Sequence, residues 1–131
     1  MDFNYYFMSS ERNQRILQAL RLTEDELLMS LGEELVPHTI GAFPKKEELI
    51  DKGKEWMNRL HDKVQCVVCS STKVREAFEK NEDVLIAAAI ADVIVGFCTG
   101  VSPVTVAALI TKRCLLNFCS PIWDNKQSDR R

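Results

Sequence analysis

The most apolar stretch of the chain runs from residue 84 to residue 119, and the segments on either side of it are far more polar. Its first part, residues 84–97, contains no proline and is rich in alanine and isoleucine, which favours a buried helix over a strand of that length. Gly100 predicts the end of this helix. Ser102-Pro103 then predicts the start of a second helix, which continues to about residue 118. We therefore expect a buried helical hairpin over residues 84–119 at the centre of the protein.

The longest segment with helical periodicity precedes this hairpin, at residues 45–80. Apolar or small residues recur there every three or four positions, on one side of a helix, namely Leu49, Gly53, Trp56, Leu60, Val64, Val67, Ser71, Val74 and Phe78. The opposite side is rich in charged residues. The pattern predicts one long amphipathic helix, with a possible kink at residues 70–72, where hydroxyl side chains compete for backbone hydrogen bonds. A strand over residues 63–69 is an alternative, because valine favours strands.

Two shorter helices are predicted nearer the N-terminus. Ser9 or Ser10 can cap the first, which continues to about residue 20. Thr23 and Glu26 have the spacing of a capping box, which starts a second helix that ends near residue 36. Residues 1–8 are expected to form an aromatic arm that packs its rings on the bundle, with a partner-binding aromatic patch as the alternative. Residues 37–44 are expected to form a connection that contains His38. After residue 119, Pro121 is expected to end the last helix and to leave a frayed polar tail at residues 124–131.

These elements together predict an all-α fold. We expect a compact bundle of about five helices around the hairpin at 84–119, within a single domain of residues 1–131. The long helix at 45–80 would measure about 50 Å if it were continuous rather than kinked. Such a helix would extend past a small core, and its apolar residues would need cover from a second chain.

Composition narrows the class of protein further. The chain has 46% hydrophobic and 27% charged residues, as in an ordinary globular protein. A net charge of −2 gives no sign of a nucleic-acid partner. The apolar runs are interrupted by Asp92 and by Lys112-Arg113, which argues against a membrane span. No signal peptide is visible, so the five cysteines are expected to be reduced thiols in a cytoplasmic protein.

The cysteines are one candidate for chemistry. Cys66 and Cys69 have the spacing of a zinc-binding or redox pair, and Cys114 and Cys119 could complete a four-thiolate site. However, the first pair is predicted to lie within a helix and the second is loosely spaced, so small packing residues are the favoured interpretation. We expect no bound metal and no cofactor.

Asp92 is the other candidate, because a lone carboxylate in an apolar helix must be paired, protonated or at an edge. The hairpin turn would place it about one helical turn from Lys112 and Arg113. The favoured interpretation is therefore a structural ion pair with one of these cations. A ligand-binding or catalytic acid is the alternative.

The sequence therefore predicts a non-enzymatic interaction or regulatory module that acts through protein–protein contacts. The expected partner is another protein or a second copy in a homodimer, without nucleic acid or membrane. The predicted interface residues are aromatic: Phe3, Tyr5, Tyr6, Phe7 and Trp56. The alternative function is a metal- or small-ligand-binding sensor that uses Cys66, Cys69 or Asp92, and a small enzyme is the least favoured class.

Overall fold

The computed structural model describes the backbone of residues 2–36 and 44–129 and the side chains of residues 11–36 and 44–124. All regular structure in this part of the chain is helical, which confirms the predicted all-α class. Seven α-helices and one short 3₁₀ helix lie within these ranges, where the sequence pattern predicts about five. His38 and the rest of the predicted connection at residues 37–43 lie outside the described residues.

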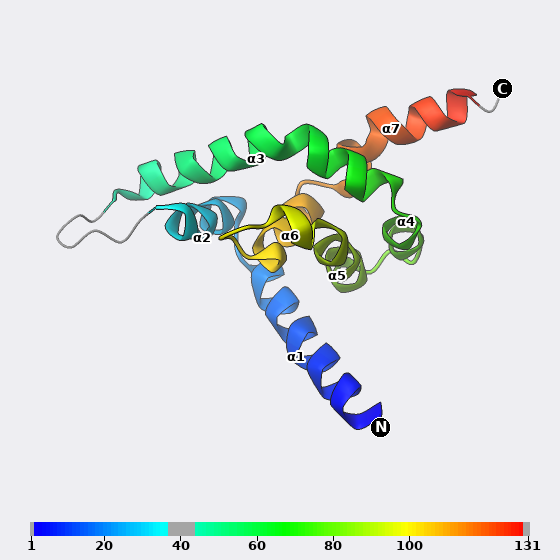
Figure 1. Ribbon diagram of the computed structural model, residues 1–131, viewed down its shortest axis with the longest axis horizontal. Coiled ribbons are helices and arrows are strands. Elements are labelled where there is room, and N and C mark those ends of the chain that lie inside the picture. The colour runs from blue at the N-terminus through cyan, green and yellow to red at the C-terminus, as the bar shows by residue number, and fades with distance from the viewer. Residues whose placement is uncertain (1, 37–43, 130–131) are drawn as a thin grey trace.

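The helices follow one another in chain order (Figure 1). Their bounds are α1 Asp2–Arg21, α2 Glu24–Leu35, α3 Lys46–Ser70, α4 Thr72–Glu79, α5 Asp83–Ile94, η1 Val95–Phe97, α6 Pro103–Lys112 and α7 Leu115–Asp129.

Two helix starts have the hydroxyl caps that the sequence predicts, and a third is capped by a hydroxyl at the predicted kink. Thr23 forms a complete capping box with Glu26, in which each side chain accepts a hydrogen bond from the other residue's backbone N–H. Ser102 caps α6 by accepting a hydrogen bond from the Thr105 N–H, with Pro103 directly behind it. Ser71 ends α3 and also caps α4 through the Val74 N–H. The periodic segment 45–80 is thus broken at the predicted weak point.

The most deeply buried element is α6. Five consecutive residues, Val106 to Ile110, are almost inaccessible to solvent. Helices α1, α2, α5 and α7 all contact α6, so it forms the centre of the bundle. One face of α5 is also buried, which places much of the predicted apolar hairpin in the core.

Helices α2 and α3 approach each other more closely than ordinary side chains allow. Gly32 of α2 lies against the backbone of Leu49, and Gly53 of α3 lies against the backbone of Leu28. A Cβ atom at Gly32 would come within 2.7 Å of the Leu49 carbonyl carbon. Both glycines are therefore required for this packing.

The second arm of the hairpin is shorter than predicted. Helix α6 ends at Lys112, and Cys114 adopts a positive φ of 73° that separates it from α7. Few residues other than glycine adopt this conformation, so the sequence contains no clear signal for the break. The chain changes direction here, and α7 packs on α3 as well as on α6.

The prediction that Pro121 ends a helix is wrong, because α7 continues through it to Asp129. Proline cannot donate a hydrogen bond to the carbonyl group four residues earlier, which belongs to Asn117. The Ser120 hydroxyl donates a 3.4 Å hydrogen bond to that carbonyl instead. The continued helix also buries Trp123, whose indole N–H donates to the Cys69 carbonyl at 2.8 Å. Tertiary packing thus offsets the lost backbone bond.

The prediction that Ser9 or Ser10 caps the first helix is wrong, because α1 already begins at Asp2 and includes residues 2–8 of the predicted arm. Its C-terminal part packs on α5 and α6 through Ile16 and Ala19, while its N-terminal part extends away from the other helices (Figure 1). At the other end of the chain, α7 continues helical to Asp129 where a frayed tail was predicted. The side chains of Phe3, Tyr5, Tyr6 and Phe7 lie outside the described residues.

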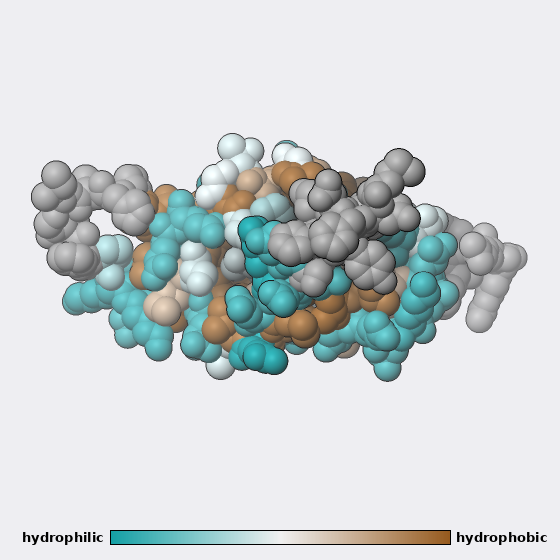
Figure 2. Space-filling view, turned by 90° about the horizontal axis from the view of Figure 1, so that it is seen from below, coloured by the Kyte–Doolittle hydropathy of each residue, from teal (hydrophilic) through white to brown (hydrophobic). Residues whose placement is uncertain are grey.

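The described surface is mixed in polarity. Viewed from the side on which α1 projects, apolar residues reach the surface between polar ones (Figure 2). Among the side chains that the structure describes, four large apolar ones are exposed: Leu17, Leu85, Val95 and Leu116. In the described part of the chain, no helix has both the length and the apolar character needed to cross a membrane.

Candidate functional site at the junction of α1, α4 and α5

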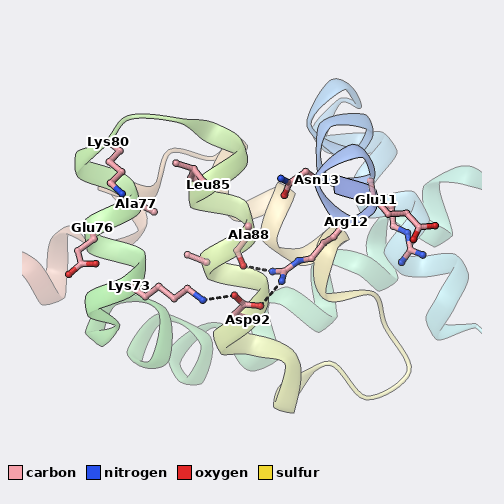
Figure 3. A pocket seen from close by; sticks show the side chains of 12 residues that line it. Glu11, Arg12, Asn13, Lys73, Glu76, Ala77, Lys80, Leu85, Ala88 and Asp92 are labelled. Carbon is pink, nitrogen blue, oxygen red and sulfur yellow. Dashed lines mark hydrogen bonds and ion pairs between the residues drawn. The ribbon is translucent and has the colours of Figure 1, made fainter. Parts of the chain in front are cut away.

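Asp92 connects three helices on one side of the bundle. From its position on α5, its two carboxylate oxygens bind Arg12 of α1 and Lys73 of α4, each at 2.8 Å. Arg12 also donates a hydrogen bond to the Ala88 carbonyl on α5. Figure 3 shows the two cations reaching Asp92 from opposite sides. The carboxylate therefore fixes the position of α5 relative to both neighbours.

The predicted partners of Asp92, Lys112 and Arg113, are engaged elsewhere, so this expectation is wrong. Lys112 donates to the Leu20 carbonyl at 2.9 Å, and Arg113 lies 3.7 Å from Glu24. Asp92 lies on the exposed side of α5, whereas the buried side of this helix faces the core. A hairpin pattern places residues along two helices, but it does not say which side of each helix faces the other.

A groove of about 740 Å³ surrounds this junction. Leu85, Ala77, Ala88 and Ala89 contribute apolar surface to it. Its charged lining residues are the cations Arg12, Arg15, Lys73 and Lys80 and the acids Glu11, Glu76 and Asp92. The groove thus combines small and apolar side chains with a charged rim, as protein-binding surfaces do.

The electrostatics of the junction keep Asp92 ionised. Partial burial disfavours the charged carboxylate, but the hydrogen bonds from Lys73 and Arg12 outweigh this effect and lower the pKa of Asp92 below its ordinary value of 3.8. Both pairs are partly open to solvent, so each contributes modestly to stability.

Replacing Asp92 with asparagine is expected to lower the free energy of unfolding by about 1 kcal/mol at neutral pH, because two partly exposed ion pairs are lost. Since the folded-state pKa of Asp92 is lowered, its contribution is present above the unfolded-state pKa. The contribution disappears as the pH falls through the folded-state value. The difference between the two proteins should therefore shrink below about pH 4, as measured by urea unfolding at both pH values.

Asp62 provides the control for this prediction, because it is fully exposed on α3 and its recorded ion pair is with the neighbouring His61. Asp62→Asn should change the free energy of unfolding by less than about 0.5 kcal/mol. An equal loss for both variants, or a loss at Asp92 that does not change with pH, would contradict the assigned role of Asp92.

Two of the five cysteines form a disulfide, which corrects the expectation of five free thiols. Cys69 at the end of α3 is bonded to Cys119 of α7, with Cα atoms 5.4 Å apart. This bond removes two of the four sulfurs proposed for a metal site. Within the described residues, no group of three or more histidine, cysteine, aspartate or glutamate side chains is arranged to hold a metal ion. The argument for a cytoplasmic location from reduced thiols is also lost, so that location stays a prediction.

The remaining cysteines differ in their surroundings. Cys66 and Cys114 are exposed, whereas Cys98 is buried. Burial, together with the negative charge of Glu34, raises the pKa of the Cys98 thiol to about 11. Cys98 is therefore protonated and poorly nucleophilic at neutral pH.

Trp56 does not take part in an exposed interface. It is only 4% exposed and belongs to the hydrophobic core. Its position on the apolar side of α3 is the one that the periodic pattern predicts. That pattern alone cannot distinguish a residue that faces the core from one that faces a partner.

Arg12 and Lys73 are the junction residues that sequence reasoning missed. Neither lies in a motif. Arg12 is 80 positions and Lys73 is 19 positions from Asp92 along the chain. The one available signal was the need of Asp92 for a cation, and 17 lysines and arginines could have met it.

Comparisons of the chain with protein families, curated proteins and solved structures give no significant match. The functional argument therefore depends on the residues and geometry described above.

Proposed function

We propose that this protein is a non-enzymatic helical interaction module that forms a homodimer through α1 and the groove between α1, α4 and α5. In this arrangement, the N-terminal half of α1 from each copy lies in the groove of the other. The observation that carries the proposal is the position of the groove beside a helix that extends beyond its own bundle (Figure 1).

The sequence of the extending segment supports this proposal. Residues 2–8 contain four of the ten aromatic residues of the chain, namely Phe3, Tyr5, Tyr6 and Phe7. Aromatic side chains contribute a large part of the binding energy in protein interfaces, because each buries a large area and loses few rotamers. A helix with this sequence is suited to binding in a groove.

The groove is complementary to such a helix. Leu85 is 40% exposed and, with the neighbouring alanines, offers a surface that a helix can approach closely. Arg15 and Lys80 are further lining residues, and cations of this kind interact favourably with the faces of tyrosine and phenylalanine rings. The occupant is thus a helix with aromatic residues and little charge, as in residues 2–10.

Two-fold symmetry makes the arrangement self-consistent. Glu11, Arg12, Asn13 and Arg15 of α1 line the groove, so the groove begins where the extending half of α1 ends. Two α1 helices that cross in antiparallel orientation near these residues would place each aromatic segment over the other copy's groove. The same contact is then made twice, as in a closed isologous dimer.

Replacing Leu85 with glutamate is expected to weaken the dimer at least about tenfold, because it places a charge in the apolar part of the contact. The double variant Phe3→Ala, Phe7→Ala should have a similar effect from the other side of the interface. Sedimentation velocity across micromolar concentrations measures the dissociation of each protein.

Leu116→Glu is the matched control, because Leu116 is also exposed but lies on α7. It should leave the dimer unchanged. A wild-type protein that is a monomer throughout this concentration range would disprove the homodimer. Equal weakening of the dimer by Leu116→Glu would indicate that the interface does not lie in the groove.

The alternative function predicted from the sequence, a metal- or small-ligand-binding sensor, is less well supported. Cys69 is bonded to Cys119, and Asp92 is already neutralised by two cations. A metal would have to displace these partners, so we do not adopt this function.

A further inference from the structure

A second, smaller cavity lies between α3, α6 and α7, away from the groove described above. Its volume is about 250 Å³. Apolar side chains from all three helices contribute to its walls, namely Trp56, Met57, Val64, Ile110 and Phe118. This volume is slightly below the range of about 300 to 1,000 Å³ that is typical of ligand pockets. The cavity therefore suits a small molecule.

The polar residues that line this cavity are few, and none of them is acidic. Asn58, His61, Asn117 and Arg113 complete the lining. Arg113 is the one permanent charge among the described residues that line it. Its recorded ion pair with Glu24 uses Nε at 3.7 Å, which is a weak contact for a guanidinium group with five N–H donors. An apolar cavity with an arginine and two carboxamides is suited to an anionic head group on an apolar body.

The wall formed by α7 is held in place independently of any ligand. The Gln65 side chain donates to the Phe118 carbonyl at 2.8 Å, and the Cys69–Cys119 disulfide lies one residue further along α7. The His61 ring also packs edge-on against Phe118, with centroids 5.3 Å apart. A preformed cavity reduces the entropy that a ligand must lose on binding.

We propose that this cavity is a binding site for a small aromatic monocarboxylate. The aromatic part of the ligand would contact Trp56, Phe118 and the aliphatic walls. The carboxylate would accept hydrogen bonds from the Arg113 guanidinium, for which carboxylates are geometrically matched acceptors. This inference does not depend on the proposed dimer.

Phenylacetate and its neutral analogue phenylacetamide are the probes, titrated into the ¹⁵N-labelled protein and followed by NMR. Phenylacetate should cause saturable shifts of backbone amides around the cavity and bind roughly tenfold or more tightly than phenylacetamide, because it alone forms the charge-assisted pair. Arg113→Gln should remove this preference while phenylacetamide binding is retained. Retained binding of the amide shows that the cavity is intact in the variant.

Arg59→Gln is the control, because Arg59 is exposed on α3 and does not line the cavity. It should preserve the preference for the carboxylate. Asn117→Phe, on the exposed rim, should block both probes. Equal affinity for the two probes in the wild type, shifts centred elsewhere, or no saturation up to about 10 mM would overturn the proposal.

Discussion

Replacing Gly53 with alanine is expected to lower the free energy of unfolding by about 3 kcal/mol or more. The new methyl group would meet the backbone of Leu28, whose carbonyl carbon lies 3.1 Å from the required Cβ position. Backbone atoms in the middle of a helix cannot rotate away as a flexible side chain can, so α2 and α3 would have to separate. Gly32→Ala should have an effect of the same order, because it meets the backbone of Leu49. Urea unfolding measures both losses.

Gly96 provides the control, because a Cβ atom there would have no neighbour within 4 Å. Gly96→Ala should change the free energy of unfolding by less than about 0.5 kcal/mol. If the Gly53→Ala variant were as stable as the Gly96→Ala variant, this result would contradict the close packing of α2 against α3.

Loss of the disulfide between Cys69 and Cys119 is expected to cost about 4 kcal/mol, because the bond closes a loop with a sequence separation of 50 residues. This is a large fraction of the total stability of a typical domain, about 5 to 15 kcal/mol. The double variant Cys69→Ala, Cys119→Ala should therefore unfold at a much lower urea concentration than the oxidised wild type. Reductant should lower the stability of the wild type but not that of the variant.

Cys66→Ala is the matched control, because its thiol is exposed and lies on the same helix as Cys69. It should be almost as stable as the wild type. Thiol titration of the denatured wild type without reductant should give three free groups, and a count of five would contradict the disulfide directly.

The stability of α7 has consequences for the small cavity. Phe118 and Asn117 line this cavity and precede Cys119 along the same helix. Loss of the disulfide should therefore also weaken binding of phenylacetate to the proposed carboxylate site. The proposed dimer uses α1, α4 and α5 and should be less affected.

Local signals in the sequence predicted most helix starts, but not the start of α1 at Asp2. Thr23 and Ser102 each act as the cap that the sequence predicts, and Ser71, at the predicted kink, caps α4. A cap satisfies backbone N–H groups two or three residues away, so the information that specifies it lies within a few positions. The apolar periodicity of residues 45–80 was equally informative, since Leu49, Trp56 and Val64 are buried as predicted.

The sequence by itself thus determined the helical class, most helix starts and the residues suited to the core, because these depend on local hydrogen bonding and on the 3.6-residue period. Only the tertiary structure decided which faces meet. Contacts between helices that are distant in the sequence decide three features. These are the pairing of Asp92 with Arg12 and Lys73, the bond between Cys69 and Cys119, and the continuation of α7 beyond Pro121. In each case the energy of packing or pairing between helices outweighs the local preference, and no short segment contains that information.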